Sequence, residues 1–155
     1  MEKRVLYIAS DHAGFELKNK LIEFLFDLGY KVRDIGPYGY NEDDDYPDFV
    51  IPCVIEVSKR SDDNVVGIVI GGSGQGEAIA ANKVKGIRAV VYYGGDKKII
   101  TLSKEHNDAN VLSLGARFIS TRKAKNVVKL WLETKFEKED RHVRRLRKIR
   151  RYEGR

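Results

Sequence analysis

A glycine-rich segment, GGSGQGEAIAANK, begins at Gly71 directly after the apolar run VVGIVI and contains one early acid, Glu77. Its glycines allow positive φ angles and let backbone amides approach a bound group, while the start of a following helix adds unpaired N–H donors. An oxyanion or a phosphate would fit such a loop. Glu77 is either a functional side chain there or an ordinary first-turn acid favoured by the helix dipole, and the segment alone leaves both interpretations open.

Five further polar residues lie where the chain leaves or enters an apolar run. Asp11 and His12 follow RVLYIAS without a spacer, His106 and Asn107 come shortly before VLSL, and Arg117 follows that run. Each has a plain structural alternative: a helix N-cap, a residue near a helix C-terminus, a turn former or a surface arginine. Only in combination do these residues indicate a site.

The C-terminal segment DRHVRRLRKIRRYEGR places Arg141 and Arg145 one helical turn apart, with His142 beside them. Two guanidinium groups on one helix face can hold a phosphate through bidentate hydrogen bonds. A solvated charged helix and a nucleic-acid-binding arm are the alternatives. Because Tyr152 is the single aromatic residue of the segment, base stacking on a single strand is disfavoured.

Apolar strands and amphipathic helices alternate along the chain with short connections. This pattern predicts a three-layer, Rossmann-like α/β sandwich with a five-stranded parallel sheet and a C-terminal basic helix. The expected strands are 5–10, 31–35, 65–70, 87–93 and 109–114. The expected helices are 14–27, 48–59, a short one from 77 that Gly86 closes, 96–105, 120–133 and a last one from about 140. Ligands of such sheets collect at the carboxyl ends of the strands, where Asp11 and the glycine loop lie.

The composition indicates one globular domain spanning residues 1–155, with 42% apolar residues. We expect a cytoplasmic protein, since the chain shows neither a signal region nor an apolar run of membrane-spanning length. The single cysteine, Cys53, is expected in the core, and the absence of a Cys/His cluster argues against a structural zinc site. The formal charge of +6 is local: residues 141–155 carry +7, which leaves −1 on the first 140. A nucleic-acid partner and a membrane partner are therefore not expected.

Two nucleotide-binding motifs are missing. The glycine loop lacks the Lys-Ser/Thr pair of a P-loop, because Glu77 and Ala78 follow Gly76. The turn after the first strand carries only Gly14, although Asp34 stands where a ribose-binding acid is found in dinucleotide-binding proteins. A phosphate site without a nucleotide is the preferred interpretation.

Taken together, SDHAGFELK, YPD, GGSGQGEAIAANK, GIRAVV, SKEHNDANVLSLGAR and DRHVRRL make the chain resemble the ribose-5-phosphate isomerases of type B, a family that includes isomerases of galactose and allose 6-phosphates. The resemblance runs from Ser10 to about Leu146. It implies interconversion of D-ribose 5-phosphate and D-ribulose 5-phosphate in the pentose phosphate pathway through an enediolate, without metal or cofactor. Many members carry a catalytic cysteine at the start of the loop, where this chain has Gly71. It resembles instead the branch whose base is a glutamate, here Glu77.

The resemblance also assigns roles to the other residues. It implies that Ser73 handles protons on the substrate oxygens, that His106 opens the sugar ring and that Asp11 lies near the ring oxygen or hydroxyls. Asn107 binds a hydroxyl, and backbone amides form an anion hole. The hole comprises Gly72, Ser73, Gly74, Gln75 and Gly76, and the phosphate is held by Arg141, Arg145, His12 and Arg117.

The resemblance further implies a homodimer, or a tetramer built from it, with the site at the interface. His106, Asn107 and Arg117 are then expected from the partner subunit. Residues 149–155 lie beyond the matched motifs and are expected to form a solvated basic tail. Two rival functions stay open: an isomerase of a six-carbon sugar phosphate, and a nucleic-acid-binding module that uses the basic helix.

Overall fold

The sheet is built around β3 (Val65–Gly71), which is buried at every position, as its continuous apolar sequence predicts. The computed structural model describes residues 4–60 and 64–154. In it, β3 pairs with β1 (Val5–Ser10) on one side and β5 (Val111–Gly115) on the other. The outer strands are β2 (Lys31–Gly36) and β4 (Ala89–Tyr92), giving the order β2-β1-β3-β5-β4 with every pair parallel.

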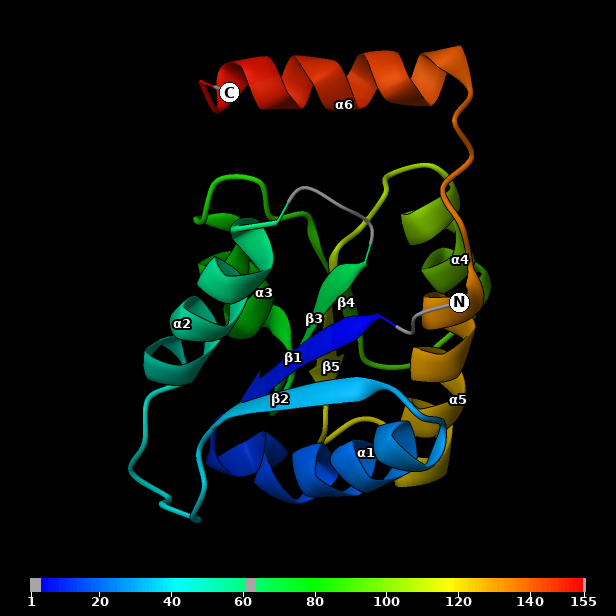
Figure 1. Ribbon diagram of the computed structural model, residues 1–155. Coiled ribbons are helices and arrows are strands. Elements are labelled where there is room, and N and C mark those ends of the chain that lie inside the picture. Colours follow the sequence, from blue (N-terminus) through cyan, green and yellow to red (C-terminus); the bar gives the residue numbers. More distant parts are fainter. Residues whose placement is uncertain (1–3, 61–63, 155) are drawn as a thin grey trace.

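Helices cover both faces of this sheet, so the predicted three-layer α/β architecture is confirmed (Figure 1). One face packs against α1 (Phe15–Asp27), α4 (Lys98–Glu105) and α5 (Thr121–Glu133). The other packs against α2 (Pro47–Ser58) and α3 (Gln75–Asn82). Two apolar layers result, and Cys53 lies in the second, fully buried as expected.

The strand order creates a topological switch point between β1 and β3. From β1 the chain moves outward to β2, whereas from β3 it moves past β5 to β4. The connections therefore diverge at the carboxyl ends of β1 and β3, which is where ligands of open α/β sheets bind. Residues 11–14, including the short 3-10 helix η1 (His12–Gly14), and residues 71–77 line this position.

The last helix, α6 (Asp140–Tyr152), lies apart from the three layers, at the amino end of the sheet (Figure 1). Its distal part faces the residues that precede β4 and β5, since Glu153 Oε2 accepts a hydrogen bond from Gly86 N at 3.2 Å. Residues 149–152, expected to belong to a solvated tail, are exposed but continue the helix as far as Tyr152. Among the residues that the structure describes, no helix is long and apolar enough to cross a membrane.

Most element boundaries depart from the sequence prediction by one or two residues, but α3 ends at Asn82, four residues before the Gly86 that was expected to close it. Helix α3 begins at Gln75, two residues before Glu77, because Gly74 takes a left-handed conformation (φ 79°) that allows the chain to turn into the helix at once. Strand β4 is limited to Ala89–Tyr92. Two helix ends are capped as their residue types favour: Gly29 follows α1 at φ 81°, and the Ser120 hydroxyl accepts a hydrogen bond from Lys123 N at α5.

Candidate active site

The glycine loop is fastened to the segment that follows β5. Ala116 N donates to Gly71 O at 2.8 Å and Arg117 N donates to Gly72 O at 3.1 Å. The buried Ser113 hydroxyl donates to Gly74 O at 2.7 Å. These bonds hold the loop carbonyls toward the sheet and so fix the conformation in which α3 begins, with its first amides at the carboxyl edge.

Glu77 is folded back onto Gly71. A Cβ atom built on Gly71 would overlap the Glu77 carboxyl group, so the bare glycine is what leaves room for this acid. The residue is 3% exposed, and burial raises the pKa of its carboxyl group above the usual range; the bond from its own backbone N–H opposes the rise, and the nearby charge of Asp11 adds to it. A carboxyl group with a raised pKa, placed at the end of a glycine-rich loop, is suited to accept a proton from carbon.

Asp11 and His12 occupy the exit of β1, as predicted. The Asp11 carboxylate accepts a hydrogen bond from Gly14 N at 3.2 Å, so the N-cap alternative for Asp11 is correct as a description of the local structure. Asp11 is nonetheless close enough to Glu77 to affect its pKa. The side chain and backbone N–H of His12 both contact Asp44, a residue that the sequence analysis did not single out.

Arg117 lies beside the glycine loop of its own chain. A Cβ on Gly72 would stand 3.2 Å from Arg117 Nη1, and the charge of Arg117 acts on His12. The expectation that the partner subunit supplies Arg117 to this loop is therefore wrong. The reason is the strand order: β5 is the neighbour of β3, so the residues that follow the two strands meet.

His106 and Asn107 lie at the opposite end of the sheet. They follow α4 and come before β5, whose first residue is Val111. The His106 ring is stacked on the His142 ring of α6, with centroids 4.2 Å apart and planes 18° apart. Burial is the main cause that lowers the pKa of His142, and the charges of His106 and Arg141 lower it further. A neutral His142 permits this close contact, and α6 is thereby attached to the end of α4.

The two arginines of α6 lie at this amino end as well. Both are exposed, and Arg141 Nε contacts Glu139 Oε2 at 2.9 Å. The residues brought together at the carboxyl edge are Asp11, His12, the 72–76 loop, Glu77 and Arg117; those at the amino edge are His106, Asn107, Arg141 and Arg145. The seven residues of β3 separate the two edges by about 20 Å, too far for one sugar phosphate to touch both groups in one chain.

Two groups of three side chains bring histidine and carboxylate atoms within 4.8 Å: Asp11, His12 and Asp44, and His106, Glu137 and His142. Such sets can ligate a divalent cation. In the first, Nδ1 of His12 is engaged by Asp44. In the second, two nearly parallel rings cannot both hold one ion in their planes, and an imidazole ligates in its plane. Both groups are accounted for without a metal.

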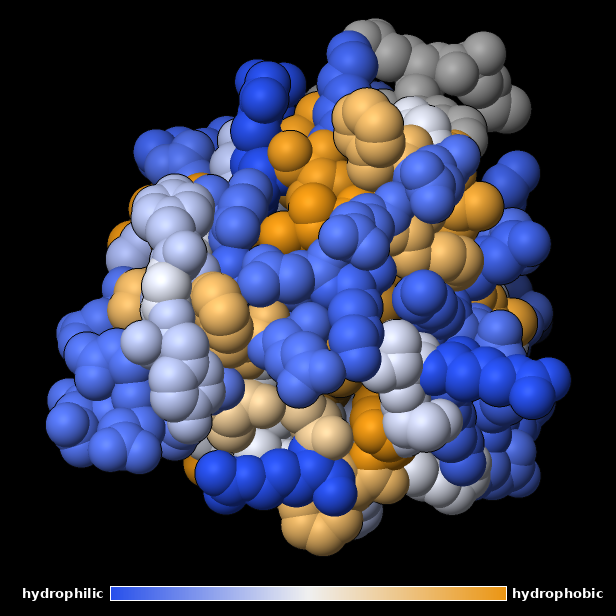
Figure 2. All heavy atoms as spheres, turned by 90° about the horizontal axis from the view of Figure 1, so that it is seen from below, coloured by the Kyte–Doolittle hydropathy of each residue, from blue (hydrophilic) through white to orange (hydrophobic). Residues whose placement is uncertain are grey.

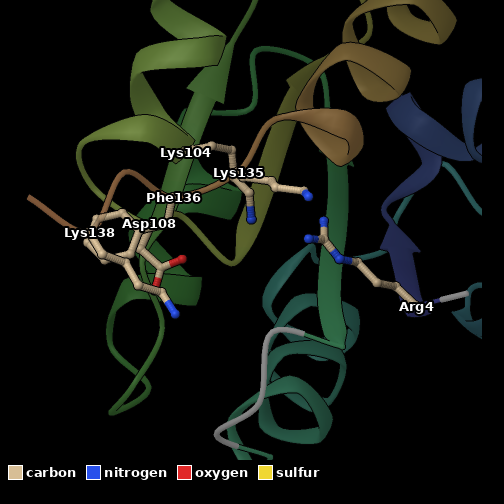
Figure 3. Close-up of a pocket in the computed structure, with 6 residues that line it drawn as sticks. All are labelled: Arg4, Lys104, Asp108, Lys135, Phe136 and Lys138. Carbon is tan, nitrogen blue, oxygen red and sulfur yellow. The ribbon is translucent and has the colours of Figure 1, made fainter. Parts of the chain in front are cut away.

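A basic pocket of about 240 Å³ lies outside these groups, near the end of α4 (Figure 3). Its lining residues are Arg4, Lys104, Asp108, Lys135, Phe136 and Lys138. Arg4 donates to Leu132 O at 2.9 Å and Lys104 donates to Ala109 O at 2.9 Å, so both cations tie the ends of helices and strands together. The pocket is explained by this packing role.

The carboxyl edge also exposes aromatic side chains. Tyr40, Tyr93 and Phe118 are each more than half exposed, and they flank His12 or the residues that follow β4 and β5. In the view from below, hydrophobic patches interrupt a mostly hydrophilic face (Figure 2). Exposed aromatic side chains around a polar site are typical of a surface that a partner covers.

The comparisons with known proteins all indicate the same family. Residues 6–149 match the model of the Ribose/Galactose Isomerase family. The chain is 39% identical over 149 residues to ribose-5-phosphate isomerase B of Mycolicibacterium paratuberculosis, covering 96% of this chain and 91% of that protein. It is 41% identical over 148 residues to a probable ribose-5-phosphate isomerase B of Mycoplasma genitalium, covering 96% and 95%.

Solved structures are similar over nearly the whole chain. The crystal structure of ribose-5-phosphate isomerase B from Mycoplasma genitalium with bound ribulose 5-phosphate superposes with a TM-score of 0.93 at 40% identity, covering 99% of each chain. The type B enzyme of Clostridium thermocellum gives a TM-score of 0.88 at 43% identity, covering 97% of each chain.

Proposed function

The chain belongs to the Ribose/Galactose Isomerase family, and on that premise we propose that it interconverts D-ribose 5-phosphate and D-ribulose 5-phosphate through an enediolate. The observation that carries the assignment to this chain's own residues is the Glu77 carboxyl group, which is buried against Gly71 in the first turn after the glycine loop. It combines a base of raised pKa with donors for a developing oxyanion.

In the proposed reaction Glu77 takes the proton from carbon 2 of the open-chain aldose and returns it to carbon 1. The negative charge that develops on the enediolate oxygens is stabilised by the amides of residues 72–76. The Ser73 hydroxyl, at the turn into α3, passes protons between the substrate oxygens. Asp11, beside Glu77, binds the ring oxygen or hydroxyls. No step needs a metal ligand among these residues.

The remaining residues of the site come from a second copy in this proposal. A homodimer that sets the amino edge of one copy on the carboxyl edge of the other brings His106 and Asn107 to the sugar, and Arg141 and Arg145 to the phosphate. His12 and Arg117 then meet the same phosphate from the first copy. The distance between the two edges of one chain and the exposed aromatic rim support this arrangement. A cytoplasmic location also remains part of the proposal.

The choice of substrate is tested by comparing kcat/KM for ribose 5-phosphate, allose 6-phosphate and galactose 6-phosphate. Substrate length is set by the depth of the pocket between two copies and not by Glu77. We expect the five-carbon substrate to be preferred. A preference for a six-carbon substrate would reassign the chain within its family, and turnover of none of the three would contradict the proposed function.

A further inference from the structure

The imidazole of His12 is held at two points by one carboxylate. Asp44 Oδ1 lies 2.6 Å from His12 Nδ1 and accepts a hydrogen bond from His12 N at 3.0 Å. Asp44 comes from the irregular segment between β2 and α2, 32 residues along the chain. The double contact fixes both the backbone and the ring of His12, so that Nε2 is the ring nitrogen left to a ligand.

The environment of Asp44 requires a positive partner. Its side chain is 6% exposed, and Oδ2 is buried with no hydrogen-bond partner within residues 4–60 and 64–154. A carboxylate removed from water in this way is costly unless an opposite charge compensates it. The imidazolium form of His12 supplies that charge at hydrogen-bonding distance.

From this geometry we infer that Asp44 is a positioning residue for phosphate binding, which orients His12 and keeps it as an imidazolium that donates Nε2–H to the substrate phosphate. The inference rests on the phosphate-binding role of His12 in the proposed function. It adds to the known motifs a carboxylate that touches no substrate atom. An imidazole without this partner would lose charge in the neutral pH range, where the enzyme needs a cation.

Of the charged and titratable groups around His12, some raise the pKa of its ring and others lower it. Asp44 and Asp11 are the acids that face it, Arg117 is the cation from the segment after β5, and the Tyr40 ring meets it edge to face at 6.3 Å. The hydrogen bond that the His12 ring donates to Asp44 is the largest cause that raises the pKa of His12, and desolvation and the charge of Arg117 oppose it. Removing the charge of Asp44 therefore leaves the lowering effects in place.

The test compares Asp44→Asn with Asp43→Asn, a matched change of the exposed neighbouring carboxylate. Asparagine keeps an oxygen that can accept both hydrogen bonds and removes only the charge. We expect the pKa of His12, followed by NMR of its ring, to fall in Asp44→Asn and to stay unchanged in Asp43→Asn. The dissociation constant of inorganic phosphate, measured by calorimetry, should rise about tenfold at pH 7.5, and KM for ribose 5-phosphate should rise by a similar factor with kcat nearly unchanged.

The rise should be smaller at acid pH, where protonation of the His12 ring is favoured in both proteins. An unchanged pKa of His12 in Asp44→Asn, or equal effects of the two variants on phosphate binding, would overturn the inference. The ring titration and phosphate binding are measured without turnover. They decide the role of Asp44 even if the wild-type protein shows no isomerase activity, a result that would contradict the proposed function instead.

Discussion

The carboxyl group of Glu77 occupies the space that a side chain of residue 71 would fill. The two positions lie on different elements, the end of β3 and the first turn of α3, and the short glycine loop brings them into contact. This contact fixes the position of the Glu77 carboxyl group, which is the proposed base.

Gly71→Ala should reduce kcat by about 100-fold, because the added Cβ displaces the base from its reactive position. The control is Gly39→Ala, since a Cβ on Gly39 meets no atom within 4 Å and its φ is not positive. Steady-state kinetics of both variants decide the point, with thermal melts to confirm folding. Wild-type activity in Gly71→Ala would show that Glu77 does not need its observed position.

Glu77→Gln should lower kcat by about 1,000-fold while inorganic phosphate still inhibits residual activity with an unchanged constant. In the wild type, kcat should fall as the pH is lowered, because the base must be deprotonated. Since the pKa of Glu77 is raised, this fall should begin at a higher pH than an ordinary glutamate would cause. A pH–rate profile measures this. Full turnover by Glu77→Gln would exclude Glu77 as the base.

The same variant should gain stability at neutral pH. The folded-state pKa of Glu77 is raised, so the folded protein holds this proton more tightly than the unfolded chain, and stability falls as the pH rises through the shifted pKa. Glu77→Gln removes that loss. Its melting temperature should exceed that of the wild type at pH 7.5 and match it near pH 4, as calorimetry can show. A lower melting temperature at pH 7.5 would contradict the direction of the pKa shift.

Mixing two inactive variants tests the two-edge arrangement. Glu77→Gln changes the carboxyl edge and His106→Asn the amino edge, so a mixed dimer holds one intact site. After unfolding and refolding together, about one quarter of wild-type activity should return, because half of the dimers are mixed and each has one working site of two. If both groups of residues served a site within one chain, mixing would restore nothing.

Cys53 should be dispensable. It is fully buried between α2 and the sheet, and burial raises the pKa of its thiol far above neutral pH, so it is neither a nucleophile nor a base. Cys53→Ala should keep kcat and KM, and iodoacetamide should leave the folded wild type active. Loss of activity on alkylation of the native protein would point to a role that its burial does not suggest.

The fold and half of the candidate site could be predicted from the sequence, because both depend on short stretches of neighbouring residues. The apolar run before Gly71 predicts a central strand, and the residues that directly follow β1 and β3 identify the carboxyl edge. Partnerships across the chain have no such signal. Asp44 meets His12 only because of the path of the segment after β2, although the acidic run NEDDD beside YPD marks that segment as unusual.

Two other relationships depend on topology. The stack of His106 on His142 joins the end of α4 to α6, and nothing in the spacing of the two histidines indicates it. The placement of Arg117 beside Gly72 follows from β5 lying next to β3, an order that the sequence pattern leaves undetermined. Contacts between residues far apart in the sequence therefore could not be predicted, because they depend on the order of the strands and on the path of α6.

The contact of Glu77 with Gly71 makes the residue type allowed at one position depend on the other. A cysteine at position 71 and a glutamate folded back from position 77 exclude each other, since both claim the same space. A single substitution from either arrangement yields a collision or a site without a base. A change from one arrangement to the other on this backbone therefore needs both positions to change, or the glutamate to turn away from the loop.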